Sequence, residues 1–477
     1  MSPSAPIETD VVVVGAGLSG LRAALDLHKA GLSFVVLEAM SRVGGKTRSV
    51  DASTLGGKVD IGAAWINNTS QSEMYALARG FGFELIEQRT TGDNLKQIFD
   101  GSVQRRPYGS FDPTKPEDLE AIQKFVGVLN AHVSAAHPES PHLGPDAAML
   151  DCVTFEEYAE KHAPGGVGAA FSRTISESYL GVGPREVSAL FMVDYIRSGT
   201  GFENMNSDKK HGGQYLRNRQ GNQMFSVRLA AQLPADTVRL STPAEKITQQ
   251  PQGGCLVETA GAGLAFRAKR VIVSVPTTLY SLITFEPPLP AAKLALGDNT
   301  ALGYYAKTIF VFDRPWWREA GLSGIMESTD GPISFSRDTC SVDDNQYSIT
   351  CFIVGDSGRQ WSKWSAAERR RLVTAQFDAV MGVAARKQDI LVPAPINVIE
   401  KEWVKDPWAR GAPSPVMLPG VLTTDSGKSI RDAHDKIHFI GTETALVWKG
   451  YMEGAVRSGI RGAKEVIEAL SAAKLQP

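Results

Sequence analysis

TDVVVVGAGLSGLRAALDLHKAGLSFVVLEAMSRVGGKTR, residues 9–48, is the stretch that decides the fold. Its β-branched run at residues 11–14 predicts a strand. A glycine turn follows at residues 15–20, then a helical pattern of leucine and alanine, then a second apolar run that ends at Glu38. This order of strand, glycine turn, helix and strand predicts the βαβ unit that binds dinucleotides.

Each glycine of the turn has an expected task. Gly15 makes the tight turn, Gly17 lets backbone approach a pyrophosphate, and Gly20 lets the helix pack closely on the strand. The N-terminus of the helix offers N–H groups and a positive dipole end to the phosphates. Glu38 stands where a carboxylate would bind ribose hydroxyls. A plain glycine turn in an α/β core is the alternative, but strand, helix and acid together favour nucleotide binding.

Composition excludes several classes of protein. The 477 residues carry 50 Lys plus Arg against 52 Asp plus Glu, and the net charge of −2 gives no reason to expect a nucleic acid partner. The four cysteines form no CxxC pair and the eight histidines show no metal-ligand spacing, so we expect no metal site and no disulfide framework.

Targeting signals are also missing from the sequence. The first ten residues, MSPSAPIETD, have neither the basic nor the apolar region of a signal peptide. No apolar run approaches the ~18 residues of a membrane helix. We therefore expect a cytoplasmic protein without a membrane partner; a homodimer is compatible with the sequence but not required by it.

Two further segments extend the nucleotide pattern. Residues 60–65, DIGAAW, are small and end in an aromatic residue, which would let backbone approach a flat ring; a tight packing loop is the alternative. Residues 441–455, GTETALVWKGYMEGA, predict a helix that begins near Tyr451. Such a helix points its positive end at whatever lies before it, which suits a group that carries negative charge. A glycine-bounded core helix is the alternative.

These segments resemble the FAD-binding motifs of flavin amine oxidases of the monoamine oxidase family. The resemblance covers essentially the whole chain, and within the family it is greatest to the fungal amine oxidases that act on fumonisin-type mycotoxins. One departure is Lys46, where the family usually has arginine, so the charge is kept and the planar fork is lost. The segments that carry the resemblance are SRVGGKT, DIGAAWIN, SDKKHGGQY, LGYYAK, PISFSRDT, ITCFIVGDSGR and VWKGYMEGAVRSG.

The resemblance implies an α/β protein of two lobes. A Rossmann-type FAD-binding domain of residues 1–80, 208–290 and 420–477 is interleaved with a substrate-binding domain of residues 81–207 and 291–419, which combines a mixed sheet with helices. Local patterns predict strands at residues 238–247, 255–259, 264–268, 270–276, 304–312, 349–355 and 436–441, and helices from residue 116 and over 154–162, 366–380 and 450–470.

The same resemblance assigns the FAD contacts. They are Gly15, Gly17, Leu18, Ser19, Gly20, Glu38, Ala39, Arg42, Gly45, Lys46, Gly62, Ala63, Ala64, Trp65, Ala244, Gly441, Glu443, Gly450, Tyr451 and Met452.

One loop indicates whether FAD is bound covalently and which tyrosines form the aromatic cage around the substrate amine. A family member with a covalent flavin carries cysteine and tyrosine where this chain has Ala412 and Pro413. We therefore expect FAD held without a covalent bond, and a cage in which Tyr451 is the only tyrosine.

Lys307 is the second expected catalytic residue, beside Tyr451. It shares one face of a predicted strand with Tyr305, Ile309 and Val311, which is costly unless the lysine has a partner or a task. An exposed edge strand is the alternative. The resemblance implies that Lys307 holds a water against flavin N5 and assists the reaction with oxygen.

The implied reaction oxidises a primary amine, with O₂ as acceptor, to a carbonyl compound, ammonia and H₂O₂. The implied substrate is a long-chain amino-polyol with carboxylate arms, such as fumonisin. Candidate substrate contacts are Tyr215, Arg410, Trp448 and Lys449, of which the two cations would suit an anionic ligand or be solvated surface charges. The alternatives are a monoamine, polyamine or L-amino-acid oxidase, and a flavin-free binding protein of the GDP-dissociation-inhibitor type.

Overall fold

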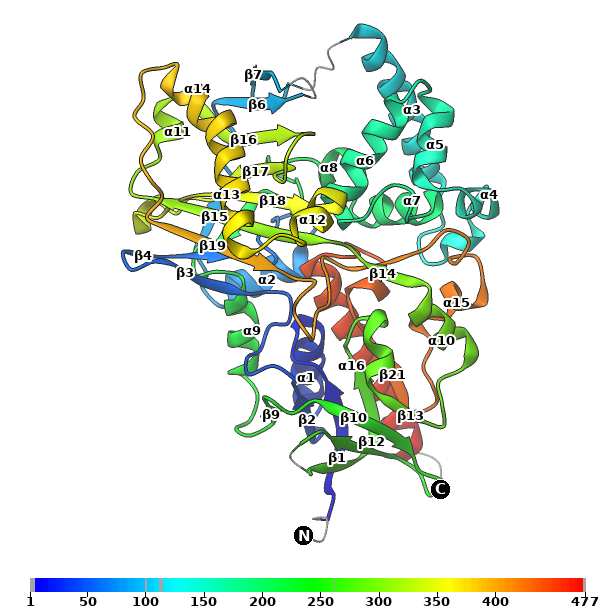
Figure 1. Ribbon diagram of the computed structural model, residues 1–477. Coiled ribbons are helices and arrows are strands. Elements are labelled where there is room, and N and C mark those ends of the chain that lie inside the picture. The colour runs from blue at the N-terminus through cyan, green and yellow to red at the C-terminus, as the bar shows by residue number, and fades with distance from the viewer. Residues whose placement is uncertain (1–4, 99–100, 111–114, 262, 475–477) are drawn as a thin grey trace.

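The computed structural model describes residues 5–98, 101–110, 115–261 and 263–474. Residues 1–4, which belong to the segment used for the signal-peptide prediction, lie outside these ranges. Figure 1 shows a lower part built around β1 and the long helix α16, and an upper part with a second sheet on one side and helices α3–α8 on the other. No helix in the described ranges is both long and apolar enough to cross a lipid bilayer.

The first sheet contains the predicted βαβ unit. Among the described residues it has eight strands in the order β13-β10-β11-β12-β1-β2-β9, with β21 paired to β12. β1 pairs in parallel with both β2 and β12, which places the glycine turn at the carboxyl end of the central strand. The strands are β1 (Ile7–Val14), β2 (Phe34–Leu37), β9 (Val238–Arg239), β10 (Ala244–Gln249), β11 (Cys255–Thr259), β12 (Ala265–Val273), β13 (Thr284–Glu286) and β21 (Ile437–Phe439).

Two strand predictions were wrong in this sheet. Residues 238–247 form two strands, and β9 pairs with β2 while β10 pairs with β11 and β13. Ser241 has φ +51° between them, and Pro243 lacks the N–H that a continuous ladder needs. Conversely, residues 264–268 and 270–276 were predicted as separate strands but form the single strand β12, which pairs with β11, β1 and β21.

The helices α1 (Leu18–Lys29) and α16 (Met452–Lys474) pack against each other. Their backbones approach closely, because a Cβ on Gly459 would lie 2.3 Å from the carbonyl oxygen of Ser19. This contact joins the two motifs that lie at opposite ends of the sequence.

The second sheet lies in the upper part of Figure 1. Its order is β19-β15-β18-β17-β16-β6-β7. Side chains of Trp316, Trp317 and Phe377 join the buried cluster on one of its faces. The strands are β6 (Asp93–Gln97), β7 (Val103–Pro107), β15 (Tyr305–Phe312), β16 (Leu322–Ser328), β17 (Phe335–Asp338), β18 (Tyr347–Val354) and β19 (Asn397–Glu402), and the nearby helices are α11 (Trp316–Glu319), α12 (Gly355–Trp361), α13 (Ala366–Phe377) and α14 (Val383–Arg386).

A helical group with its own buried cluster covers the other side of the upper part. It confirms the predicted helices from Pro116 and over residues 154–162, the latter with a capping box between Thr154 and Glu157. The helices are α3 (Pro116–Ala135), α4 (Ala147–Cys152), α5 (Phe155–His162), α6 (Val167–Leu180), α7 (Ala189–Ser198) and α8 (Phe202–Met205).

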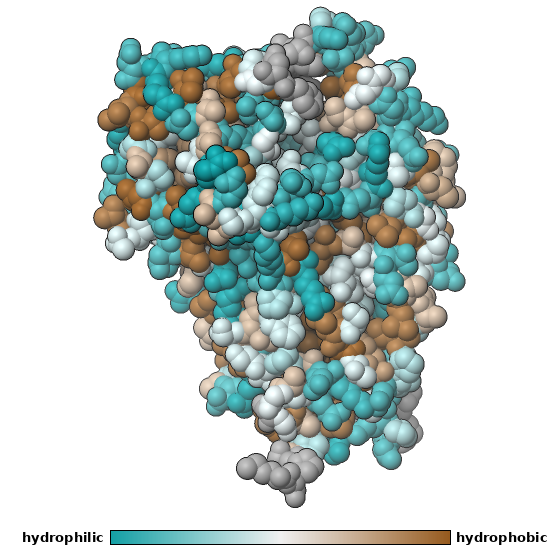
Figure 2. All heavy atoms as spheres, viewed as in Figure 1, coloured by the Kyte–Doolittle hydropathy of each residue, from teal (hydrophilic) through white to brown (hydrophobic). Residues whose placement is uncertain are grey.

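The remaining elements are short connections. They are β3 (Ser49–Ser53), β4 (Gly56–Asp60), β5 (Leu85–Glu87), β8 (Leu216–Asn218), β14 (Thr300–Leu302), β20 (Pro415–Met417), α2 (Ser72–Gly80), α9 (Gln223–Ala230), α10 (Ala291–Asp298) and α15 (Asp425–Lys428). Along the chain, segments that supply strands to the first sheet alternate with segments that supply strands to the second, as expected for two interleaved lobes. The boundaries between the five domain segments stay a prediction. On the face shown in Figure 2, hydrophobic and hydrophilic side chains are interspersed.

Candidate active site

One cavity of about 410 Å³ is lined by residues of both sheets. It begins at the carboxyl ends of β1 and β2, where open α/β sheets bind their ligands, and extends to Lys307 and Tyr451. Every residue expected to contact FAD lines this cavity except Gly20 and Arg42. The sequence motifs therefore converge in space, although they span residues 15–452.

Gly20 and Arg42 do not line the cavity, but each supports a loop that does. A Cβ on Gly20 would lie 2.0 Å from the carbonyl oxygen of Gly15, so only glycine permits this packing of helix on strand. Arg42 Nη2 donates to the carbonyl oxygen of Gly45 at 2.9 Å. Gly20 has the packing task expected of it, while Arg42 supports the Gly44-Gly45 loop from outside the cavity lining.

The nucleotide end of the cavity fits an extended dinucleotide. α1 begins after Gly17 without a side-chain cap, and a Cβ on Gly17 would meet nothing within 4 Å. The first N–H groups of α1 therefore face open space, as a phosphate would require. Glu38 accepts hydrogen bonds from Ala16 N at 2.7 Å and Met40 N at 2.8 Å, which fixes its carboxylate at the cavity wall. Burial raises the pKa of Glu38, and these N–H donors oppose that rise.

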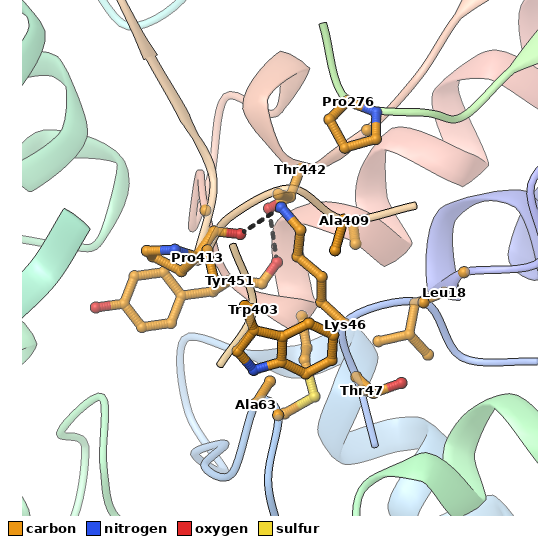
Figure 3. A pocket seen from close by; sticks show the side chains of 18 of the residues that line it. Leu18, Lys46, Thr47, Ala63, Pro276, Trp403, Ala409, Pro413, Thr442 and Tyr451 are labelled. Atoms are coloured by element: carbon orange, nitrogen blue, oxygen red, sulfur yellow. Dashed lines mark hydrogen bonds between the residues drawn. The ribbon is translucent and has the colours of Figure 1, made fainter. Parts of the chain in front are cut away.

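Lys46 and the loop at residues 412–413 meet farther along the cavity. Figure 3 shows the Lys46 side chain reaching the carbonyl oxygen of Pro413, a hydrogen bond of 3.1 Å, with Trp403 and Tyr451 around the same space. Burial lowers the pKa of Lys46 to about 8. Ala412 and Pro413 line the cavity, and no described cysteine does.

Lys307 is buried and does not lie on an exposed edge strand, since β15 is flanked by β19 and β18. It lies on β15, and its Nζ donates to the carbonyl oxygens of Asp60 at 3.0 Å and Gly62 at 2.5 Å. The rings of Trp65 and Phe352 lie 5.8 and 5.1 Å from the same nitrogen. Burial lowers the pKa of Lys307 to about 8, and the nearby Asp60 carboxylate opposes this shift.

Tyr451 stands directly before α16, with its ring in the cavity lining. Its ring packs edge-on against Trp448 at 4.8 Å and lies 6.2 Å from Tyr195. Thr442 Oγ1 donates to its carbonyl oxygen at 2.7 Å, which fixes the backbone. Burial raises the pKa of Tyr451, so its hydroxyl stays protonated at neutral pH.

Sequence reasoning identified one aromatic wall, and the structure adds others. They include Tyr179, Tyr195, Tyr305, Phe335 and Phe352. Tyr305 and Phe335 lie in LGYYAK and PISFSRDT, which carried the family resemblance. No local pattern in the sequence marks the other walls, because Tyr179, Tyr195 and Phe352 come from α6, α7 and β18.

Lys449 does not reach the substrate end of the cavity. It is buried outside the lining, where Nζ forms an ion pair with Asp194 on α7. Arg197 also contacts Asp194, at 2.9 Å. The two roles predicted for Lys449, a substrate contact or a solvated surface charge, are therefore both wrong. Its charge is neutralised by Asp194, a carboxylate that is distant in sequence.

The other three candidate substrate contacts also lie outside the lining. Arg410 is exposed and has φ +52°, so it is a solvated surface charge, which was the alternative predicted for it. Tyr215 is buried and donates its hydroxyl to Glu87 at 2.5 Å. Trp448 is fully buried behind Tyr451, with Nε1 donating to Ser70 Oγ at 3.2 Å. The last two residues support the site and do not line it.

Comparison with known proteins agrees with this geometry. The family described as flavin-containing amine oxidoreductase matches residues 18–467. The chain belongs to this family. The human flavin-containing amine oxidase B is 30% identical over 464 residues, which cover 97% of this chain and 86% of that protein.

Solved structures of the amine oxidase family have the same fold. Putrescine oxidase bound to putrescine matches with a TM-score of 0.88 and 28% identity, over 97% of this chain and all of that one. Cyclohexylamine oxidase from Brevibacterium oxydans matches with the same TM-score and identity, over 97% and 99% of the two chains. This amine oxidase is therefore an FAD enzyme with the expected α/β fold, and the flavin-free alternative is wrong. In the described ranges no cluster of His, Cys, Asp and Glu could hold a metal.

Proposed function

We propose that this amine oxidase oxidatively deaminates a primary amine, and that its substrate is a long-chain amino-polyol of the fumonisin type. The observation that carries the proposal is one continuous cavity, in which the dinucleotide cradle leads to Lys307, Tyr451 and the aromatic walls. Aromatic faces attract the positive edge of an amine and exclude water from the reacting carbon.

The chemistry takes two electrons and one hydrogen from the carbon that bears nitrogen, and a proton from the nitrogen, which leaves an imine. Bound FAD supplies the acceptor for them and passes the electrons to O₂, which becomes H₂O₂. Water then converts the imine to a carbonyl compound and ammonia. The protein contributes the aromatic wall at Tyr451, which orients the amine, and the buried charge of Lys307, which stabilises negative charge developing on oxygen.

A polyamine substrate is the second candidate, because putrescine is the ligand of one structural relative. Within the described ranges the acidic side chains that line the cavity are Glu38 and Glu443. Glu38 is held by backbone N–H groups, and Glu443 accepts from Thr277 N at 3.1 Å. Neither belongs to the strands that carry the aromatic walls, so a second ammonium group would find no carboxylate there. This arrangement favours a monoamine.

A peroxide-coupled assay across alkylamines, diamines, L-amino acids and a fumonisin tests the proposal. We expect yellow protein, ammonia and peroxide in equal amounts, and turnover of alkylamines and the fumonisin. Turnover of diamines or α-amino acids alone would overturn the substrate class. Flavin absorbance without oxidation of any amine would overturn the reaction.

A further inference from the structure

Arg337 on β17 lines the cavity, although no sequence motif marks it as a functional residue. β15, β18 and β17 are neighbours, and their register places Lys307 opposite Phe352 and Phe352 opposite Phe335. Directly paired residues share a sheet face, and Arg337 shares the face of Phe335 because it lies two residues further along β17. The cavity therefore has a continuous wall that runs from the buried Lys307 to the partly buried Arg337.

The guanidinium of Arg337 is held in place but keeps free donors. Its Nε lies 3.6 Å from Asp208 Oδ2, and its side chain is 19% exposed. Tyr108 donates its hydroxyl to the same oxygen at 2.6 Å, which anchors Asp208. Nη1 donates to the carbonyl oxygen of Ser336 at 3.0 Å. Nε has no hydrogen-bond partner among the described residues, and arginine carries five N–H donors in all.

Two carboxylates, Asp208 and Glu327, lie near enough to Arg337 to act on its charge. Isolated charge is costly to bury, and these carboxylates offset that cost for the partly buried guanidinium in the absence of a ligand. Asp208 does not use up the planar fork, because its oxygen stands beyond hydrogen-bond length from Nε. Paired donors of such a fork match the two oxygens of a carboxylate.

We infer that Arg337 binds a carboxylate of the substrate, and that this carboxylate is separated from the oxidised amine by an apolar spacer. The inference deepens the proposed amine oxidase function and rests on it. Lys449 and Arg410 suggest such a carboxylate from the sequence alone, but Lys449 is paired with Asp194 and Arg410 is exposed outside the cavity lining. Arg337 supplies the missing cation from within the cavity.

The spacer follows from the geometry of the sheet. Neighbouring strands lie about 4.8 Å apart, and two residues along a strand span about 7 Å, so Lys307 and Arg337 are about 12 Å apart at their backbones. Between them Phe335 and Phe352 stack with centroids 4.5 Å apart at 12°. With its amine at the Lys307 end of this wall, an α-amino acid would hold its carboxylate at the same end and leave the stacked rings uncovered. An amine with several carbons before its carboxylate fits the aromatic wall.

The experiment compares holoenzyme kcat/KM for hexylamine, 6-aminohexanoate, its neutral amide and norleucine. We expect 6-aminohexanoate to exceed the amide by about 10-fold or more, because a charge-assisted pair is worth at least that much. Arg337→Gln should remove this preference, so that the ratio of kcat/KM for 6-aminohexanoate to kcat/KM for its amide falls to about 1, while Arg337→Lys should keep part of it. Arg185→Gln, on a side chain 78% exposed, is the matched control and should change neither substrate.

Two outcomes separate the inference from the function on which it rests. If wild-type enzyme oxidises none of the amines, the proposed function fails. If it oxidises hexylamine but shows no preference for the acid, or if Arg337→Gln slows both equally, the carboxylate role is overturned. Should Arg337→Gln not fold, titration of wild-type enzyme with hexanoate and hexanamide, followed by flavin absorbance, decides the matter: equal affinity would overturn the inference.

Discussion

Lys307 Nζ donates a 2.5 Å hydrogen bond to the carbonyl oxygen of Gly62. This bond joins β15 of the second sheet to the loop that follows β4, in the segment next to the dinucleotide cradle. A second bond to the carbonyl oxygen of Asp60 fixes the ammonium group further. A positive charge is thus held at the point where the two sheets meet around the cavity.

Replacing Lys307 with methionine should slow reoxidation of the reduced flavin about 100-fold and slow its reduction by amine much less. The physical reason is that one preorganised donor near developing negative charge contributes about that factor. Stopped-flow absorbance separates the two half-reactions. Lys58→Met, on a side chain 44% exposed, is the control and should change neither. A variant slowed mainly in reduction would refute the oxygen-activating role.

The reoxidation rate should also depend on pH through the same group. Burial lowers the pKa of Lys307 to about 8, so its charge is present below that pH and is lost as pH rises through it. We therefore expect reoxidation to be fast at pH 6–7 and to fall between about pH 7 and 9. Rates measured from pH 6 to 10 test this, and the decline should be absent in Lys307→Met. An identical decline in both proteins would assign the titration elsewhere.

The cofactor motifs could be predicted from sequence because each is local. Gly17 must open a helix next to a strand end, and Glu38 must follow the second strand, whatever the rest of the fold does. The helix after Tyr451 is equally local. These short patterns converged on one cavity because the strands and helices they begin or end belong to one sheet and the helices packed on it.

The residues at the substrate end of the cavity could not be predicted from sequence in the same way. Lys449 adjoins a cavity residue in sequence, yet its partner is Asp194, more than 250 positions away. Arg337 looks like any alternating polar residue of a strand, and only the pairing of β17 with β18 turns it toward the cavity. Which strands become neighbours is a property of the tertiary fold, and single-sequence patterns do not contain it.

Replacing Glu38 with glutamine should weaken FAD binding about 10- to 100-fold. The carboxylate accepts from Ala16 N and Met40 N, and hydrogen bonds to a charged group contribute about 1.5–3 kcal/mol. Fluorescence titration of the apoprotein with FAD measures the effect. Glu468→Gln, on an exposed side chain, is the control. Unchanged affinity would contradict a role in the nucleotide cradle. Weaker FAD binding by a variant apoprotein that also unfolds at a lower temperature than wild type would contradict it too, because the loss would then reflect folding.

FAD should be released when the protein is precipitated with acid. The cavity lining contains Ala412 where a covalent member of the family has cysteine, and no described cysteine reaches the lining. The supernatant should therefore be yellow and the pellet colourless, with the released flavin measured by absorbance. Flavin that stays with the pellet after repeated washing would show a covalent bond and overturn this prediction.

Replacing Lys449 with methionine should destabilise the protein without changing its substrate preference. Lys449 and Arg197 together offset the burial of Asp194 and hold the pKa of that carboxyl below its usual range. Loss of one partner leaves a buried charge poorly compensated, at a cost of about 3 kcal/mol in the free energy of unfolding. Thermal unfolding measures the loss, and Lys464→Met, in an exposed pair with Glu468, should unfold as wild type does.

The substrate readout for Lys449→Met is the ratio of kcat/KM for 6-aminohexanoate to that for hexylamine. Since Lys449 lies outside the cavity lining and is already paired, both values should fall by the same factor or stay unchanged. A selective loss on the acidic amine would mean that Lys449 leaves Asp194 when substrate binds, and would return the carboxylate contact to this residue at the expense of Arg337.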